Sequence, residues 1–227
     1  TGMNQEKGRL DTMSSRTDMP GKRIVIVSIN RGPSDPRAMQ KEARSLARLG
    51  YDVTYVCNKA SGPAITDDQV HIDGLEMPAG RLARQLYGTR VVLREALRHR
   101  PDIVHVFDPA LIGPALRLGR SHKLRIVVDL PEDNAKQILQ KSYLGPMAVR
   151  KMVSHIYRQL SQRMLPRSDL VIAATPSIAA SLPAGCRYAI VRNYPAIADI
   201  DAIPPCKLVD DETATPALKV AYVGGIS

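Results

Sequence analysis

The chain has 227 residues, of which 44% are hydrophobic and 24% charged, and its formal net charge is +10 with a pI of about 9.7. This composition is that of a folded protein, and the length allows one large or two small domains. The longest apolar runs have the length of a strand, far below the roughly 20 residues of a membrane span, so no integral membrane protein is predicted. The first residues lack the apolar core of a secretory signal.

The cysteines Cys57, Cys186 and Cys206 are scattered without metal-ligand spacing, which predicts free thiols in a reducing compartment. The five histidines show no paired helical spacing, so no metal site is predicted. The positive charge favours an anionic partner, such as nucleic acid, a membrane surface or a phosphorylated substrate. Because Trp is absent and there is one Phe, a surface for stacking bases is poorly supplied, and nucleic acid is not expected.

The chain begins with a polar stretch, residues 1–21, whose lack of periodicity and closing Pro-Gly predict a disordered lead-in. Arg23–Ser28 is a continuous apolar run rich in β-branched residues, typical of a strand buried on both faces of a parallel sheet. A helix is predicted next, because Asp35 can cap it, Pro36 suits its first position and Gly50 can end it.

The alternation of strands and helices continues along the chain. Strands are predicted at 53–57, 103–107, 125–129, 170–174 and 188–192, with a short extended piece at 69–77. Helices are predicted at 81–99, 110–118, 176–182 and 134–165, the last interrupted near Gly145-Pro146. Because the strands are apolar throughout, this order predicts an α/β fold, a doubly wound, Rossmann-like parallel sheet with helices on both faces.

This predicted domain spans 22–198. An acidic stretch with prolines, 199–216, predicts a linker. Leu218–Val223 followed by Gly224-Gly225 predicts one more strand opening a βα unit. We therefore expect a chain that ends just inside a second domain, with 217–227 as its first strand.

Polar residues just after strands are the candidates for a site, because ligands bind doubly wound sheets at the carboxyl ends of the strands. Arg31 and Arg37 flank a glycine loop ahead of a helix and could bind an anion there, or belong to a capped, solvated turn. The loop is not GxGxxG, so a dinucleotide is not supported.

Carboxylates follow two other strands. Asp108 could hydrogen-bond a sugar hydroxyl, cap the next helix, or do both. Glu132 and Asp133 could serve general acid–base chemistry, although helix N-termini also attract acids. Asn193 lies before an aromatic-Pro turn, where plain turn chemistry is the alternative. His105 falls in mid-strand and is predicted to be a core histidine.

These motifs, in this order, resemble the family 4 (group 1) glycosyltransferases. The similar segments are 24–28 with Asp35-Pro-Arg37 and 50–54; Arg100–Pro109, which is similar to an RPDVVHxHDP segment; Val128-Asp129 with Glu132, which resembles a D-x-H-E element; and 191–195 followed by 222–225. Pro131 departs from this pattern, because it stands where relatives often carry the histidine of D-x-H-E.

The resemblance implies a GT-B fold and a retaining, metal-independent transfer from a nucleoside-diphosphate sugar, with no cofactor. It implies that this chain is the N-terminal, acceptor-binding half and is inactive alone, with the donor bound mainly by the missing domain. The expected acceptor is lipid-linked or a polysaccharide, as in polysaccharide biosynthesis. We expect it to be bound by Arg31, Arg37, Asp108, Glu132, Asp133 and Asn193, with Glu132 and Asp108 as the candidates for catalysis.

Two other functions remain open on the residues alone: a nucleotide-sugar epimerase of the same fold, and a non-enzymatic domain that binds a nucleotide or another phosphorylated ligand. A longer chain carrying the Glu-x7-Glu element of the family would favour the transferase.

The basic residues are unevenly placed, with seven Lys or Arg and no acid over 136–167. The helical pattern of 149–165 places apolar residues on one face, predicted to dock on the core: Val149, Met152, Val153, Ile156, Tyr157, Leu160 and Met164. The opposite face is predicted to bind the anionic inner leaflet of a membrane from the cytoplasm, as part of a patch of Arg117, Arg120, Lys123, Arg150, Lys151 and Arg158.

Overall fold

The computed structural model describes residues 21–194. The predictions for the lead-in, the linker and the last strand lie outside these residues. Within them, seven strands form one sheet in which all neighbouring strands are parallel, in the order β3-β2-β1-β4-β5-β6-β7. The strands are β1 (Arg23–Val27), β2 (Asp52–Asn58), β3 (Val70–Leu75), β4 (Ile103–Val106), β5 (Arg125–Leu130), β6 (Leu170–Ala173) and β7 (Tyr188–Ile190).

Helical segments connect the strands. They are η1 (Ala38–Ala43), α1 (Arg44–Arg48), η2 (Lys59–Ser61), α2 (Arg81–Ala83), η3 (Arg84–Gly88), α3 (Thr89–Arg98), α4 (Pro109–His122), α5 (Asn134–Gln140), η4 (Ser142–Leu144), α6 (Met147–Met164), η5 (Leu165–Arg167) and α7 (Pro176–Ala180). The predicted doubly wound α/β fold is confirmed. Among the described helices, none is both long and apolar enough to cross a membrane.

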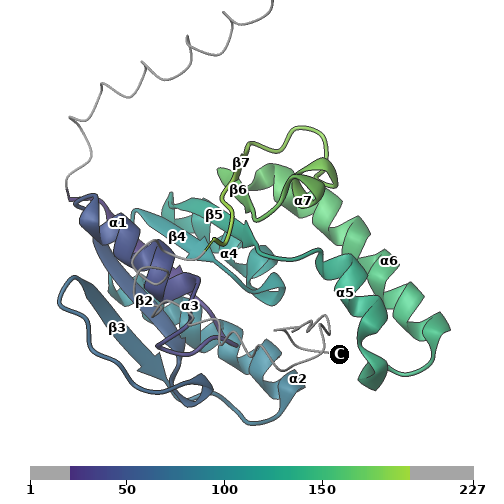
Figure 1. Ribbon diagram of the computed structural model, residues 1–227, viewed down its shortest axis with the longest axis horizontal. Helices are drawn as coiled ribbons and strands as arrows, with labels where there is room; N and C mark the ends of the chain where they lie inside the picture. The colour runs from purple at the N-terminus through teal and green to yellow at the C-terminus, as the bar shows by residue number, and fades with distance from the viewer. Residues whose placement is uncertain (1–20, 195–227) are drawn as a thin grey trace, which may run out of the picture. The chain divides into compact units, whose positions relative to one another are not determined.

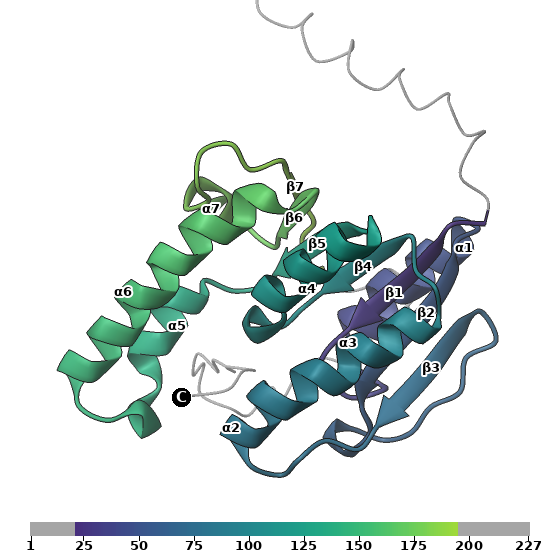
Figure 2. The same ribbon diagram turned by 180° about the vertical axis from the view of Figure 1, so that it is seen from behind.

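The core consists of two apolar layers, one on each face of the sheet. On one face α3 and α4 cover β1, β4 and β5, with Val25, Val104 and Leu111 fully buried between them. Figure 2 shows these two helices in front of the sheet. On the other face η1 and α1, seen in front in Figure 1, bury Ile26 and Tyr55.

The predicted start and end of the first helix are both found in the structure. Asp35 Oδ1 accepts hydrogen bonds from the backbone N–H groups of Arg37 and Ala38, at 3.0 and 2.8 Å, which is the predicted cap. Gly50 ends the helix with a φ of +92°, a conformation that a residue with a side chain rarely adopts. The interruption predicted near Gly145-Pro146 is also present, because α5 and α6 are separated by 141–146.

The predicted packing of α6 is correct for Val153, Tyr157 and Met164, which are half-buried, with Met164 packed against the core, but it is wrong for the other four apolar residues. Val149, Met152, Ile156 and Leu160 were expected to face the core, but they are among the exposed large apolar side chains, and Ile156 is 50% exposed. The buried positions are Ser154 and Ser161, on the opposite side of the helix. Ser154 Oγ donates to the carbonyl of Ala135 at 2.7 Å, so small residues let α6 pack closely against α5.

Candidate functional site

The order of the sheet reverses between β1 and β4, and a cleft of about 350 Å³ lies at the carboxyl ends of these strands and of β5. This is where doubly wound folds bind ligands. Three of the predicted site residues line it together, namely Arg31, Asp108 and Glu132. A second hollow, of about 360 Å³, lies between α5, α6 and α7 and is lined by Glu132 and Asp133. We take the first as the candidate site because it lies at the reversal point and its walls come from three strand ends.

Asp108 organises the wall of the cleft after β1. Its carboxylate accepts hydrogen bonds from Ser28 Oγ at 2.6 Å, from the N–H of Ile29 at 2.7 Å and from Asn30 Nδ2 at 2.6 Å. The side chain does not cap α4, although Asp108 stands at the cap position before Pro109. Because Asp108 is buried and its oxygens are occupied, its place in the fold is to position the loop that carries Asn30 and Arg31.

Arg31 sits in this wall between an acid and a ring. Its Nη1 lies 2.8 Å from Asp35 Oδ2, and its guanidinium carbon lies 5.0 Å from the centre of the Phe107 ring. Both contacts orient the guanidinium, which is partly exposed at the cleft. A cation held in this way can attract a negatively charged group of a ligand.

The two adjacent acids after β5 have different surroundings. Asp133 Oδ1 accepts from the N–H of Lys136 and caps α5. Glu132 is exposed at the cleft, and its Oε2 accepts from Gln137 Nε2. The structure therefore separates the two residues: Asp133 begins a helix, whereas Glu132 presents a carboxylate to a ligand.

Several lining residues were not predicted from the sequence. They come from the loop after β1, from η3 and from one face of α5, namely Asn30, Gln85, Asn134, Gln137, Ile138 and Lys141. The spacing of 134, 137, 138 and 141 is that of one helix face, which was the available signal. Their relation to the strand ends depends on how α5 packs, which the pattern alone does not give.

Arg37 and Asn193 do not line the cleft. The burial of Arg37 corrects the expectation that it contacts the acceptor, whereas Asn193 is exposed and its contact stays a prediction. Arg37 is only 4% exposed, and its guanidinium makes two hydrogen bonds to Asp129, at 2.8 and 3.0 Å, and two to the carbonyl of Val191. Asn193 Oδ1 accepts from Lys41 Nζ at 2.7 Å. Both residues tie η1 and its surroundings to the end of β7.

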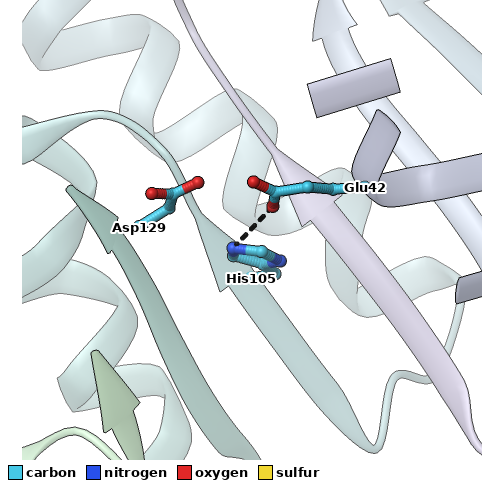
Figure 3. Close-up of side chains that lie close together, drawn as sticks. All are labelled: Glu42, His105 and Asp129. Carbon is cyan, nitrogen blue, oxygen red and sulfur yellow. Dashed lines mark ion pairs between the residues drawn. The ribbon is translucent and has the colours of Figure 1, made fainter. Parts of the chain in front are cut away.

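Glu42, His105 and Asp129 form a buried cluster (Figure 3), and Arg37 contacts two of its members. Glu42 Oε2 lies 3.5 Å from His105 Nε2, and Glu42 Oε1 lies 3.0 Å from Arg37 Nε. The one hydrogen on that Nε points to Asp129, so it leaves the Glu42 oxygen without a hydrogen bond. Burial, together with the neighbouring Asp129 carboxylate, raises the pKa of Glu42 to about 9, so that this carboxyl stays protonated at neutral pH.

His105 is the predicted core histidine, and this prediction is confirmed. Burial lowers its pKa to about 4, so the ring is neutral in the folded protein. The Glu42, His105 and Asp129 side chains are close enough together to suggest a cation site. However, the Arg37 guanidinium already balances the Asp129 charge, and a divalent ion there would meet this fixed positive charge at close range.

We expect the variant Glu42→Gln to alter how stability depends on pH. In the unfolded chain Glu42 ionises near its ordinary pKa, whereas the folded protein keeps it protonated up to about pH 9. Folding therefore takes up a proton, and wild-type stability falls as pH rises through this window. The glutamine amide does not ionise. The free energy of unfolding of the variant, relative to that of the wild type, should therefore increase by up to about 1.4 kcal/mol for each unit by which the pH is raised.

Urea unfolding at two pH values inside the window measures this difference. Glu76→Gln, at an 89% exposed side chain, is the control for the substitution itself. An equal difference between Glu42→Gln and wild type at both pH values would mean that Glu42 is ionised in the fold.

The residues of the predicted basic patch have different surroundings. Arg117 lines a hollow between α3 and α4, whereas Arg120 and Lys123 lie at the end of α4. Arg150 Nη1 donates to the carbonyl of Leu139 at 2.8 Å and so belongs to the packing of α5 and α6. Lys151 and Arg158 are exposed on α6.

Comparison with known families decides the classification. The family described as "Glycosyl transferase 4-like domain" matches residues 36–187, which is more than half of the chain. The chain belongs to this family. The resemblance found in the sequence is thereby confirmed, and the match covers η1 and the strand ends that carry Asp108 and Glu132. No curated protein matches the chain in sequence.

Solved structures of other proteins share the fold of this glycosyl transferase 4-like domain. Sucrose-phosphate synthase from Thermosynechococcus elongatus matches with a TM-score of 0.57 and 11% identity over 75% of this chain and 48% of its own. UDP-glucose: anthocyanidin 3-O-glucosyltransferase in complex with UDP matches with a TM-score of 0.50 and 9% identity, over 78% of this chain and 53% of its own. Glycyrrhiza uralensis UGT73P12 complexed with glycyrrhetinic acid 3-O-monoglucuronide matches with a TM-score of 0.50 and 12% identity, over 76% of this chain and 49% of its own. The chain thus spans about half the length of each.

Proposed function

We propose that this chain is the acceptor-side domain of a glycosyltransferase that takes a sugar from a nucleoside-diphosphate sugar. The observation that carries the proposal is the cleft at the reversal point of the sheet, lined by Glu132, Asp108 and Arg31 in a member of the glycosyl transferase 4-like family. The chain spans about half the length of these structural neighbours, and the proposal assigns the donor to a second domain.

The lining of the cleft suits a hydroxylated acceptor that also carries negative charge. Asn30, Gln137 and the Glu132 carboxylate can hydrogen-bond sugar hydroxyls, and Glu132 can accept a proton from the attacking one. Arg31 and Lys141 can bind phosphate groups. We therefore propose a lipid-linked or polysaccharide acceptor used at the cytoplasmic side of a membrane, in polysaccharide biosynthesis. The proposal includes no metal and no cofactor.

The chain alone should not transfer sugar. Stabilising the departing nucleoside diphosphate requires donor-side cations, which the proposal assigns to the other domain. We expect no release of nucleoside diphosphate when the 227-residue chain is mixed with nucleotide-sugars and acceptor glycolipids. We expect release when the same domain is joined to a donor-binding domain of its family.

Two outcomes would contradict this proposal. Steady release by the chain alone would mean that the donor binds here. Conversion of the nucleotide-sugar to its epimer, with no sugar passed to an acceptor, would assign the fold to an epimerase.

A further inference from the structure

Helix α6 carries an exposed apolar stripe formed by Val149, Met152, Ile156 and Leu160. Steps of three and four residues place them on one side of the helix, opposite the buried Ser154 and Ser161. A surface helix of a globular protein normally turns such a stripe to the core. Here α5 is packed on the serine side, so the stripe is left in solvent.

A second group of exposed apolar side chains lies at α2 and η3. Leu82 is 73% and Leu86 63% exposed. Leu86 lines a hollow of about 670 Å³ between α3 and α4, together with Leu93, Pro114 and Leu118. The cations Arg90 and Arg117 line the same hollow. Gln85, one residue before Leu86, lines both this hollow and the candidate site, so the two are neighbours.

The two groups belong to one side of the domain. Figure 2 shows α3, α4 and α6 in this order across the view. α3 contacts α4, and α4 contacts α6. The α4–α6 contact lies near Gly113 and Met164, and Arg163 is exposed beside it. We call this side the α3–α4–α6 face. Its apolar members are Leu82, Leu86, Val149, Met152, Ile156 and Leu160, and its cations are Arg90, Arg117 and Arg163.

The face is almost free of negative charge. Segments 81–88, 109–122 and 147–164 contain no Asp or Glu. α3 contains one acid, Glu95, and its Oε2 is paired with Arg98 Nη1 at 2.8 Å. Isolated exposed apolar residues are ordinary, but a group of them accompanied only by cations marks an interaction surface.

We propose that the α3–α4–α6 face docks on an anionic lipid leaflet. Apolar side chains can enter the boundary between headgroups and acyl chains, while arginines beside them bind the phosphates. A nucleic acid would use the arginines but leave the leucine, isoleucine and methionine side chains without apolar partners. The inference deepens the proposed function, because it places the candidate site next to a leaflet that holds a lipid-linked acceptor. The test of docking uses no transfer reaction, so the docking proposal and the proposed transferase function can fail independently of one another.

Because the protein contains no Trp, single tryptophans report on local insertion without background. The reporters are Leu86→Trp and Ile156→Trp, and the control is Leu49→Trp, at a 64% exposed leucine just after α1. We expect the emission of both reporters to shift to the blue with vesicles of phosphatidylcholine and phosphatidylglycerol, and that of the control to stay unchanged. No shift in either reporter, or an equal shift in the control, would overturn the proposal.

Vesicle sedimentation tests the charge requirement. Arg90→Glu with Arg117→Glu should lower binding to the mixed vesicles by about tenfold or more, because each cation near an anionic leaflet contributes on the order of 1 kcal/mol and reversal turns attraction into repulsion. Arg48→Glu with Arg187→Glu changes the net charge equally at exposed positions off the face, and should lower binding less.

Added salt should weaken wild-type binding. Circular dichroism should show both double variants folded. Equal binding to pure phosphatidylcholine and to mixed vesicles, absence of binding to either, or equal losses in the two double variants would each refute the assignment of this face.

Discussion

Replacing Arg37 by methionine is expected to lower the free energy of unfolding by about 3–5 kcal/mol, because it leaves the Asp129 carboxylate buried without its charge partner. The Asp129 side chain is 0% exposed, and both of its oxygens accept hydrogen bonds from this one guanidinium. Urea unfolding measures the loss. Arg44→Met is the matched control, since Arg44 pairs with Asp67 at the same distance of 2.8 Å but at a more exposed position, and its loss should be below about 1 kcal/mol.

Arg37→Lys, which keeps a charge but not the two-pronged geometry, should fall between the wild type and Arg37→Met. A loss in Arg37→Met no larger than that of the Arg44 control would mean that the buried Arg37–Asp129 pair contributes no more to stability than the more exposed Arg44–Asp67 pair.

Glu132→Gln is expected to lower kcat/KM for transfer by about a hundredfold in the enzyme that contains this domain, because a carboxylate acting as base typically contributes 10²- to 10⁴-fold. Stability should stay close to that of the wild type, since Glu132 is exposed. The neighbouring Asp133→Asn should change neither property much. The asparagine side-chain oxygen can still accept the hydrogen bond that caps α5, so stability should be kept, and transfer should remain within a few fold of the wild type.

This pair separates a site from a helix terminus, because the two residues are adjacent and differ in what they contact. Equal transfer by Glu132→Gln and wild type would remove Glu132 from the site. A large loss of transfer in Asp133→Asn would place the acceptor in the hollow between α5, α6 and α7 instead.

The strands and their parallel arrangement could be predicted because continuous apolar runs alternate with capped helices. The site edge could be predicted too, since Asp108 and Glu132 directly follow strands that meet at one edge. The sequence does not predict which charged residues are buried in the folded protein. Arg37 follows a loop and looks like an anion ligand, but its partner Asp129 is 92 residues away, and no local pattern connects them.

The error on α6 has a different physical origin. Helical periodicity shows that a helix has two faces, and the apolar face is normally the packed one. Here close packing against α5 selects the small residue Ser154, because its hydroxyl donates to the carbonyl of Ala135 and lets the two backbones approach. On the side of the helix that faces α5, volume and hydrogen bonding outweighed hydrophobicity. The exposed stripe became visible only when the position of α5 was known.

The contacts of Arg37 also bear on the order in which this domain forms during its synthesis. Asp129 follows Arg37 by 92 residues and Val191 by 154, so the guanidinium leaves the ribosome long before either partner has been made. β1 and β2 can pair early, because Arg23 and Asp52 are close in the chain. The bonds of Arg37 to Asp129 can form only after β5 has emerged, and its bonds to the carbonyl of Val191 wait for the residue that follows β7. A nascent chain thus completes the bonds of Arg37 only after every strand of the described sheet has been made.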